Sequence, residues 1–173
     1  IGCERGTSAE EVRELINSTL AAHNLSWQAV SIYASIDLKE DEPALSSLFD
    51  VTYFSAEELK AQSGRIATPS DYVEETVGTP SVAEAAALAA AGEGAKLIVP
   101  KTKSKRATIA IAEAPEPILP PYAGKSRGKV SVVGIGPGTR RLRSPQVSFE
   151  LAMATDWVGY DLYLDLAADI KTS

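Results

Sequence analysis

A chain of 173 residues that is 45% hydrophobic and 23% charged, with a net charge of −6, has the balance of a soluble globular protein. Such a composition argues against a disordered chain and against a protein that coats nucleic acid. No apolar run approaches the roughly 20 residues that cross a bilayer, and no charged-then-apolar signal segment opens the chain, so we expect a cytoplasmic protein with no membrane partner.

The first third of the chain predicts helices that alternate with strands. Ser8-Ala9-Glu10-Glu11 has the form of a capping box, and apolar residues recur at helical spacing through residues 8–23. Strand-forming residues follow at 29–34, then a charged turn and a short helical stretch. A second strand at 51–54 leads into Ser55-Ala56-Glu57-Glu58, a second capping box that opens another helix.

The next part of the chain predicts a loop, a helix and a hairpin. Residues 63–80 contain several glycines and prolines and are loop-like, and Ser81-Val82-Ala83-Glu84 then forms a third capping box before an Ala-rich helix. Strand-like residues at 97–99 and 108–112 flank a basic turn and are expected to pair. Strands that alternate with helices and end in a hairpin favour a three-layer α/β/α domain with a mixed sheet over residues 1–112.

Residues 113–128 differ in composition from the rest of the chain. Four prolines, two glycines and two basic residues predict a linker that is first semi-rigid and then flexible. After it, a strand at 129–133 runs into Gly134-Ile135-Gly136-Pro137-Gly138, a helix follows, and a short strand is expected at 157–159. We interpret residues 129–173 as a partial second α/β domain.

The turn at residues 134–138 lets the backbone approach a ligand and frees N–H groups for an anion or a polar cofactor. It is not a dinucleotide fingerprint, because the third glycine comes two positions on instead of three and Pro137 lacks a donor. By itself the pattern fits a simple tight turn equally well. A second strand that ends in glycine follows at the spacing of one β-α-β unit, and together the two strands make the pattern a more specific indication of a ligand site.

Three segments of this second part occur in a familiar order: residues 132–138, Ser144-Pro145 and residues 154–160. Through them it resembles the amino-terminal end of the tetrapyrrole methylases, and within that family Gly159-Tyr160 with Tyr163-Leu164-Asp165-Leu166 is similar to precorrin-3B C(17)-methyltransferases. The resemblance implies S-adenosylmethionine as the cofactor of the complete methylase. The residues it places beside that site are Gly134, Gly136, Pro137 and Gly138. Only about a quarter of the chain is covered, so we expect no working methyltransferase from these residues alone.

Four motifs occur in order in the first part of the chain: Gly2 to Thr7, Ile36 to Glu40, Val77 to Ala85, and Lys101 to Ala112. Through these motifs it resembles the carboxy-terminal domain of the cobalt-precorrin-5A hydrolase family of cobalamin biosynthesis, which also occurs alone as a small accessory protein. The resemblance implies that a tetrapyrrole lactone is opened by water with release of acetaldehyde and without a cofactor. It implies a precorrin or cobalt-precorrin substrate and other cobalamin-pathway enzymes as partners, and no nucleic acid.

Charge indicates where such a substrate would bind. A corrinoid precursor carries many carboxylates and needs several cationic side chains. The cationic candidates are Arg5, Lys39, Lys101 and Lys103, while Lys105 and Arg106 fit a solvated turn equally well. The motifs add Gly2, Gly6, Gly78, Thr79 and Ser81 as substrate-binding candidates. Residues 96–173 hold 12 basic and 7 acidic side chains, against 5 and 16 in residues 1–95, which favours anion binding in the second half.

The catalytic candidates are Glu84 as a general base and Cys3 as a nucleophile. Glu84 has a plain alternative, because it is one end of a predicted capping box. Cys3 has another, because no histidine lies near it in sequence and small buried cysteines are common. The single cysteine excludes an internal disulfide, and Cys3 and His23, the one histidine, cannot make a structural zinc site by themselves. With one histidine, a Ser-His-Asp arrangement is not expected.

Three functions stay open at this point. The first is a hydrolase-type domain fused to the start of a precorrin methyltransferase. The second is a non-catalytic module that holds or transfers precorrin intermediates, which would bind them and form no product. The third is an unrelated small α/β domain with a fortuitous glycine turn, which would bind no tetrapyrrole.

Overall fold

The computed structural model describes residues 1–48, 51–128, 130–137 and 139–170. Contacts divide the chain into two compact units, Ile1–Arg127 and Gly128–Ser173, which we call the first unit and the second unit. Within the described residues, no helix combines the length and the apolar character that a membrane span requires.

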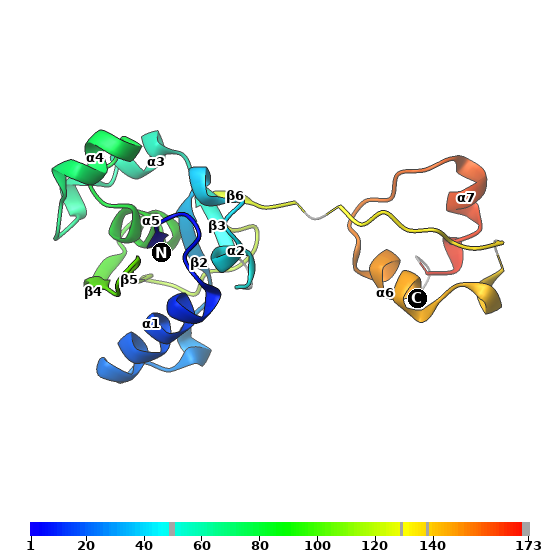
Figure 1. Ribbon diagram of the computed structural model, residues 1–173, viewed down its shortest axis with the longest axis horizontal. Coiled ribbons are helices and arrows are strands. Elements are labelled where there is room, and N and C mark those ends of the chain that lie inside the picture. Colours follow the sequence, from blue (N-terminus) through cyan, green and yellow to red (C-terminus); the bar gives the residue numbers. More distant parts are fainter. Residues whose placement is uncertain (49–50, 129, 138, 171–173) are drawn as a thin grey trace. The chain divides into compact units, whose positions relative to one another are not determined.

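The first unit is built on two three-stranded sheets (Figure 1). One sheet has the order β1-β5-β4 and is antiparallel throughout. The other has the order β2-β3-β6, in which β2 is parallel to β3 and β6 is antiparallel to β3. The strands are β1 (Gly2–Cys3), β2 (Tyr33–Ile36), β3 (Val51–Phe54), β4 (Lys96–Lys103), β5 (Ala107–Glu113) and β6 (Lys125–Ser126).

The predicted α/β class and the terminal hairpin are confirmed, but the expected single mixed sheet is divided in two. The two sheets approach each other at Ile1, whose carbonyl accepts a 2.8 Å hydrogen bond from the Ser35 hydroxyl of β2. The Ile1 amino group also donates a 2.6 Å hydrogen bond to the Ala34 carbonyl of β2. Because β1 is only two residues long, no further backbone bonds follow, and the described residues form two separate sheets.

Helices pack on both sheets of the first unit. Helix α5 contacts β2, β3, β4 and β5, and its alanine-rich sequence lets it lie close to both sheets. Helix α1 packs on β5 and α2 through a buried stripe at helical spacing that runs from Val12 to Leu20. The helices are α1 (Ala9–Ala22), α2 (Pro43–Ser46), α3 (Ala56–Lys60), α4 (Asp71–Val77) and α5 (Val82–Ala91), with short 3-10 turns at Trp27–Ala29, Asp37–Lys39 and Ser63–Arg65.

The three predicted capping boxes have different outcomes. The box between Ser55 and Glu58 forms completely at the start of α3. At α1 only half of it forms: Ser8 accepts from the Glu11 N–H, but the Glu11 carboxylate accepts from Ser104 and Arg106 instead. At α5 no side-chain cap bond forms. Two glutamates that the sequence places in caps are thus used for contacts between distant segments.

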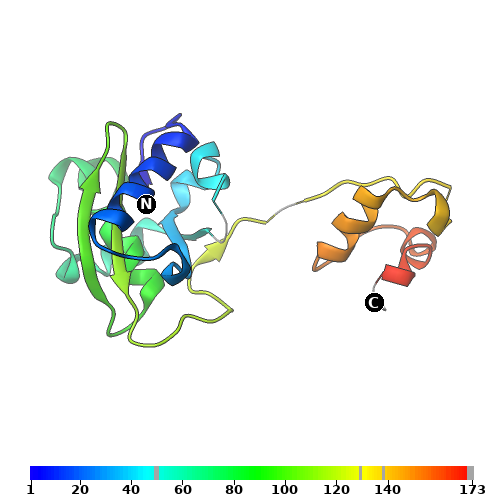
Figure 2. The same ribbon diagram turned by 90° about the horizontal axis from the view of Figure 1, so that it is seen from below.

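Most of the segment predicted as a linker lies on the first unit. Figure 2 shows it looping from the end of β5 back to β6, which pairs with β3 through Thr52 and Tyr53. The Thr52 hydroxyl also donates a 2.5 Å hydrogen bond to the Ala123 carbonyl. A strand partner more than 70 residues away, which the local composition does not indicate, holds this proline-rich segment in place.

We expect Gly124→Ala to destabilise the first unit by about 1–3 kcal/mol. Gly124 has a φ of +81°, and an added Cβ would lie 2.5 Å from the Thr52 hydroxyl and 2.8 Å from the Tyr53 carbonyl. Urea unfolding measures the effect. Gly128→Ala is the control, since a Cβ there meets nothing within 4 Å. Equal stability of the two variants would mean that residues 113–126 are not fixed to β3.

The second unit is helical where it is described. It contains α6 (Pro145–Met153), α7 (Asp161–Asp165) and 3-10 turns at Arg140–Leu142 and Ala168–Ile170. The expected helix near 144–154 is confirmed. The strand expected at 129–133 is wrong for residues 130–133, while Lys129 lies outside the described residues, and residues 157–159 are not a strand either. Val132 and Val158 are 95% and 99% exposed. A strand needs a hydrogen-bonded neighbour, and the described part of this unit offers none.

Candidate functional site

A cavity of about 510 Å³ lies in the first unit where β1, the β4–β5 turn, α4 and the start of α5 meet. We call it the cationic cavity. Among the described residues, its walls carry one acidic side chain, that of Glu4, and six basic ones. The basic residues are Arg5, Lys39, Lys101, Lys103, Lys105 and Arg106. The antiparallel pairing of Gly2 with Thr108 creates this concentration, because it brings the first residues of the chain next to the basic turn.

Most of the residues predicted from the sequence as site residues lie together in this cavity. Those that line it are Gly2, Cys3, Arg5, Lys39, Ser81, Lys101 and Lys103. Gly6, Gly78, Thr79 and Glu84 do not line it. The substrate-binding and catalytic roles of all these residues stay predictions, but the fold converts four separate motifs into one surface.

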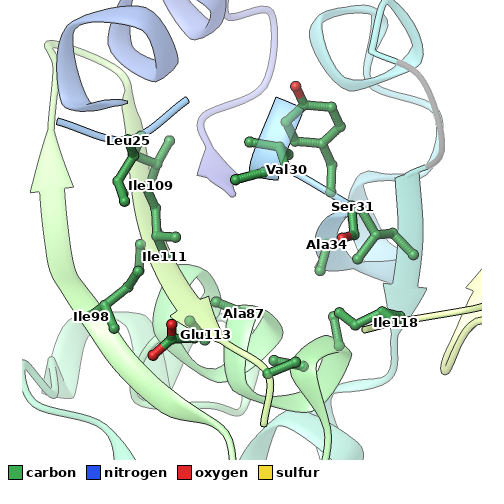
Figure 3. Close-up of a pocket in the computed structure, with 18 of the residues that line it drawn as sticks. Leu25, Val30, Ser31, Ala34, Ala87, Ile98, Ile109, Ile111, Glu113 and Ile118 are labelled. Atoms are coloured by element: carbon green, nitrogen blue, oxygen red, sulfur yellow. The ribbon is translucent and has the colours of Figure 1, made fainter. Parts of the chain in front are cut away.

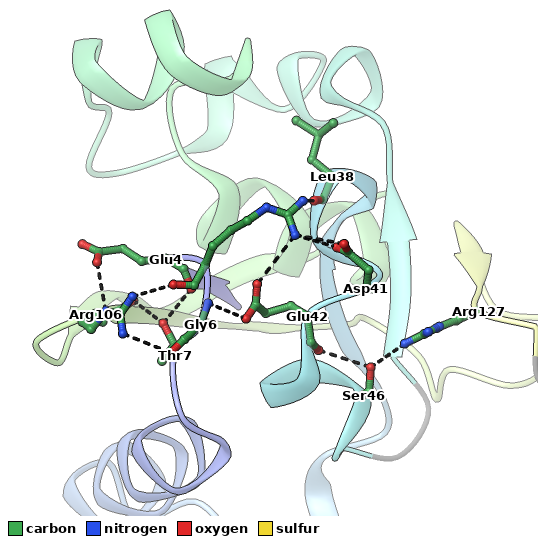
Figure 4. Close-up of polar contacts among 10 residues, drawn as sticks. Glu4, Gly6, Thr7, Leu38, Asp41, Glu42, Ser46, Arg106 and Arg127 are labelled. Atoms are coloured by element: carbon green, nitrogen blue, oxygen red, sulfur yellow. Dashed lines mark hydrogen bonds and ion pairs between the residues drawn. The ribbon is translucent and has the colours of Figure 1, made fainter.

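The two arginines of the cavity fix its walls (Figure 4). Arg5 donates to both Asp41 carboxylate oxygens, at 2.9 and 3.0 Å, and to the Leu38 carbonyl at 2.9 Å. The hydrogen bond from Arg5 holds the pKa of Asp41 below its ordinary value. Arg106 donates to the Gly6 carbonyl at 3.0 Å and to the Glu4 carboxylate at 3.1 Å. Both guanidinium groups are therefore occupied by protein partners.

A buried carboxylate also holds the loop at residues 4–6. Glu42 is 2% exposed, and its Oε1 accepts a 2.7 Å hydrogen bond from the Gly6 N–H. Gly6 has a φ of +69°, which favours glycine at this position. The predicted role of Gly6 in substrate binding is thus opposed by a structural one, since its N–H and its carbonyl both have protein partners. Sequence reasoning did not single out Glu42, because nothing local marks it as buried.

The lysines of the cavity are the charges left for a ligand. Among the described residues, Lys39, Lys103 and Lys105 form no ion pair with a carboxylate. The Nζ of Lys101 donates a 2.7 Å hydrogen bond to the Thr68 carbonyl. Burial lowers the pKa of Lys101, an effect that nearby Glu84 opposes. Three unpaired ammonium groups around one hollow are a suitable receptor for several carboxylates.

Glu84 lies behind the cavity wall and is completely buried. Its Oε2 accepts from the N–H groups of Ala67 and Thr68, each at 2.9 Å. Its Oε1 accepts from the Thr68 hydroxyl at 2.8 Å and from the Lys101 N–H at 2.9 Å. Burial raises the pKa of Glu84, but these hydrogen bonds together leave it below the ordinary value.

The role of Glu84 as a general base stays a prediction that this geometry does not favour. A base must have a free oxygen near its substrate, and both Glu84 oxygens are engaged. The predicted capping box with Ser81 is wrong, because the Glu84 carboxylate reaches residues 67, 68 and 101 instead of turning back to the cap. It thereby holds α5, β4 and the loop before α4 together.

Cys3 is half-buried on the cavity wall. Burial raises the pKa of its thiol, and the positive charge of Lys39 offsets only part of that effect. The thiol form therefore predominates at neutral pH, which does not favour the predicted nucleophile. Within the described residues, no cluster of three or more histidine, cysteine, aspartate or glutamate side chains could hold a metal ion.

The start of α5 presents unused hydrogen-bond donors to the cavity. Ser81 and Val82 both line it. Ser81 is 1% exposed, and its hydroxyl has no partner among the described residues. The N–H groups of Val82 and Ala83 likewise have no acceptor there. Thr79 is also fully buried with an unpartnered hydroxyl, while Gly78 ends α4 with a φ of +78°.

A second cavity, of about 480 Å³, lies between the two sheets of the first unit and is walled mainly by aliphatic side chains (Figure 3). Leu25, Val30, Ile98, Ile109 and Ile111 are among them. Of the residues that the structure describes, neither a candidate site residue nor a basic side chain lines it. The cationic cavity is therefore the better receptor for a polycarboxylate.

The glycine turn lies in the second unit. Gly136 has a φ of +67°, as a ligand-approaching turn or a plain tight turn would require. Gly134 and Pro137 are described, whereas Gly138 lies outside the described residues. The prediction that the four bind S-adenosylmethionine is unaffected by these observations.

Residues 1–112 match the family model described as cobalamin synthesis G C-terminus. The protein CobE of a Sinorhizobium species is 38% identical over 117 residues, which are 65% of this chain and 76% of that protein. The cobalt-precorrin-5A hydrolase of Priestia megaterium is 37% identical over 120 residues, 66% of this chain but 31% of the hydrolase.

Two solved structures are similar to the first unit. The crystal structure of CobE, described as a protein from the cobalamin (vitamin B12) biosynthetic pathway, is 41% identical with a TM-score of 0.61. It covers 64% of this chain and 84% of that one. The cobalamin biosynthesis protein chiG of Agrobacterium tumefaciens is 31% identical with a TM-score of 0.51, over 66% of this chain and 95% of that one.

Proposed function

The chain belongs to the cobalamin synthesis G C-terminus family through residues 1–112, and from this premise we propose that the cationic cavity binds a tetrapyrrole intermediate of cobalamin biosynthesis by its carboxylates. The observation that carries the proposal is the ratio of six basic side chains to one acidic side chain around a single hollow. Lys39, Lys103 and Lys105 supply mobile charges to the rim of the ligand. Arg5 and Arg106 hold the loop that shapes the hollow.

The start of α5 supplies a second place for a carboxylate. A carboxylate there would accept from the free N–H groups and lie at the positive end of the helix dipole. The unpartnered hydroxyl of Ser81 supports this assignment, because a buried hydroxyl without a partner costs free energy that a ligand oxygen can recover.

For the reaction itself we propose two alternatives. The first is hydrolytic opening of the cobalt-precorrin-5A lactone with release of acetaldehyde, which the 37% identity to a hydrolase of that name supports. The second is a non-catalytic module that holds or transfers the intermediate. The engaged oxygens of Glu84 and the protonated thiol of Cys3 favour the second, since neither offers a ready base or nucleophile.

The second unit carries its own proposal. On the resemblance of residues 129–173 to precorrin-3B C(17)-methyltransferases, we propose that it is the start of a fused methylase. When the methylase is complete, S-adenosylmethionine would supply the methyl group, and Gly134, Gly136, Pro137 and Gly138 would lie beside it.

A titration of the purified chain with cobalt-precorrin-5A tests the first-unit proposal. Binding followed by absorbance, together with an enzymatic assay for free acetaldehyde, separates the alternatives. Binding with acetaldehyde release identifies the hydrolase, and binding without it identifies the accessory module. A chain that binds neither cobalt-precorrin-5A nor another polycarboxylate tetrapyrrole would contradict both.

We expect Ser81→Ala to weaken tetrapyrrole binding by about 3-fold to 10-fold while raising the free energy of unfolding by up to about 1 kcal/mol. The change removes a donor that the ligand uses and a buried hydroxyl that the free protein leaves unpaired. Thr19→Val is the matched control, because Thr19 also has an unpartnered buried hydroxyl but lies outside the cavity. If Ser81→Ala loses stability but binds the tetrapyrrole as before, the hydroxyl has a structural role and does not contact the ligand.

A further inference from the structure

We propose that α4 is a movable wall of the cationic cavity that lays the ring of Tyr72 on the face of the bound macrocycle. This inference rests on the proposed tetrapyrrole ligand and adds a residue that contacts the ring system itself. The lysines account for binding of the charged rim. They leave open what contacts the flat, apolar face of the ligand.

The face of α4 that lines the cavity is distinct in chemistry from the other walls. Tyr72, Val73, Thr76 and Val77 all line the cavity. Positions 72 and 76, and 73 and 77, are one helical turn apart, so the four side chains share one side of the helix. This side has no charge, whereas the loop after β1, the end of β4 and the β4–β5 turn contribute basic groups. The cavity thus combines an apolar wall with a cationic one, as an amphiphilic ring with a carboxylate rim requires.

Tyr72 is unusually exposed for a large aromatic residue that lines a cavity. It is 76% exposed. In the part of the chain that the structure describes, its ring pairs with no other aromatic ring. Much of the ring is therefore still available for contact, and stacking on another π-system is a favourable use of that surface.

Few contacts hold α4 in its present position. None of its residues is buried, and the half-buried Val77 at its end packs against the core cluster that contains Ile36 and Phe54. The Ser70 N–H donates a 2.9 Å hydrogen bond to the Pro80 carbonyl, and this bond joins the two ends of the segment that contains α4. The ion pair between Lys60 and Glu74 is 3.8 Å long and exposed at both side chains, so it stabilises the position only weakly.

The end of α4 allows the helix to turn as a body. Gly78 terminates it in the left-handed region, and the loop before it contains Pro69. Segments with few buried contacts open and close at low free-energy cost. A small rotation about the Ser70–Pro80 base that keeps the Val77 contact would change the distance between Tyr72 and the lysines of β4.

Tyr72→Ala tests the inference with uroporphyrin, a stable porphyrin whose rim carries acetate and propionate groups. We expect about a 10-fold loss of affinity or more, near-native affinity for Tyr72→Phe, and loss of the stacking-induced change in the porphyrin absorption band. Citrate, which has carboxylates but no ring, should bind both variants and the unchanged protein equally. Tyr160→Ala is the matched control, since Tyr160 is 82% exposed and lies in the second unit.

The outcomes separate this inference from the proposed function. If Tyr72→Ala binds uroporphyrin as tightly as the unchanged protein, the inference is wrong and the cationic binding site stands. If the unchanged protein binds neither uroporphyrin nor cobalt-precorrin-5A, the proposed function fails and this inference fails with it. If α4 closes on the ligand, amide hydrogen exchange in residues 71–77 should become slower on binding. Unchanged exchange would contradict the proposal that α4 moves.

Discussion

Glu84→Ala is expected to lower the free energy of unfolding of the first unit by about 3–5 kcal/mol. The substitution leaves the N–H groups of Ala67, Thr68 and Lys101 without their acceptor in a buried site. Urea unfolding followed by circular dichroism measures the loss. Glu93→Ala is the control, because Glu93 lies in an exposed turn and its side chain forms no hydrogen bond or ion pair with the described residues.

Glu84→Gln is expected to be intermediate in stability. One amide oxygen can still accept, but the amide nitrogen must face donors that previously met an oxygen. The pair of variants also decides between the two roles of this residue. A Glu84→Gln protein that keeps its stability but loses acetaldehyde release would contradict the structural role and support the general base.

The stabilising effect of Glu84 should depend on pH in a defined direction. Its pKa in the folded protein is lowered, so folding favours the charged form. The stabilisation is fully present above the unfolded-state pKa of about 4.3 and is lost as the pH falls through the lower folded-state pKa. The stability difference between the unchanged protein and Glu84→Gln should therefore shrink below about pH 4.

The double variant Lys39→Ala/Lys103→Ala is expected to bind uroporphyrin about 10-fold to 100-fold more weakly at low ionic strength. Each lysine contributes a charge-assisted hydrogen bond worth about 1 kcal/mol or more to a ligand carboxylate. Neither has a carboxylate partner among the described residues, so removing it does not leave a protein charge unpaired. Fluorescence titration at several salt concentrations measures the change.

The salt dependence provides a second test of the same variant. The affinity of the double variant for uroporphyrin should depend less on salt concentration than that of the unchanged protein, because fewer cations contact the ligand. The matched control is Lys96→Ala/Lys125→Ala, which removes the same charge from residues that do not line the cavity. Equal weakening in both double variants would mean that overall charge, and not the cationic cavity, attracts the porphyrin.

The sequence predicts the composition of the candidate site better than its geometry. Arg5, Lys39, Lys101 and Lys103 are found from spaced motifs and from the charge that a polycarboxylate requires, and all four line one cavity. The partners of Glu84 are not predictable in this way. Ser81 at the right spacing indicates a cap, while the actual donors lie 16 and 17 residues away. Local spacing cannot rank a cap against a tertiary contact.

The remaining differences have the same physical origin. Helix α4 lies in a stretch whose glycines and prolines predict a loop, and β6 lies in a proline-rich segment that becomes a strand only because β3 is beside it. Residues 130–133 show the reverse case, since their strand-forming side chains have no neighbouring strand in the described part of the second unit. Pairing partners decide strand formation here, and the local sequence does not contain them.

The clamp formed by Arg106 and Glu42 on residues 4–6 affects how a ligand would be selected. Because hydrogen bonds from distant segments fix this loop, its arrangement of charges is set during folding and loses little conformational entropy when a ligand arrives. A preorganised receptor of this kind discriminates by the spacing of carboxylates around a ring. Isomers that differ only in the order of their acetate and propionate groups should therefore differ in affinity even though their total charge is the same.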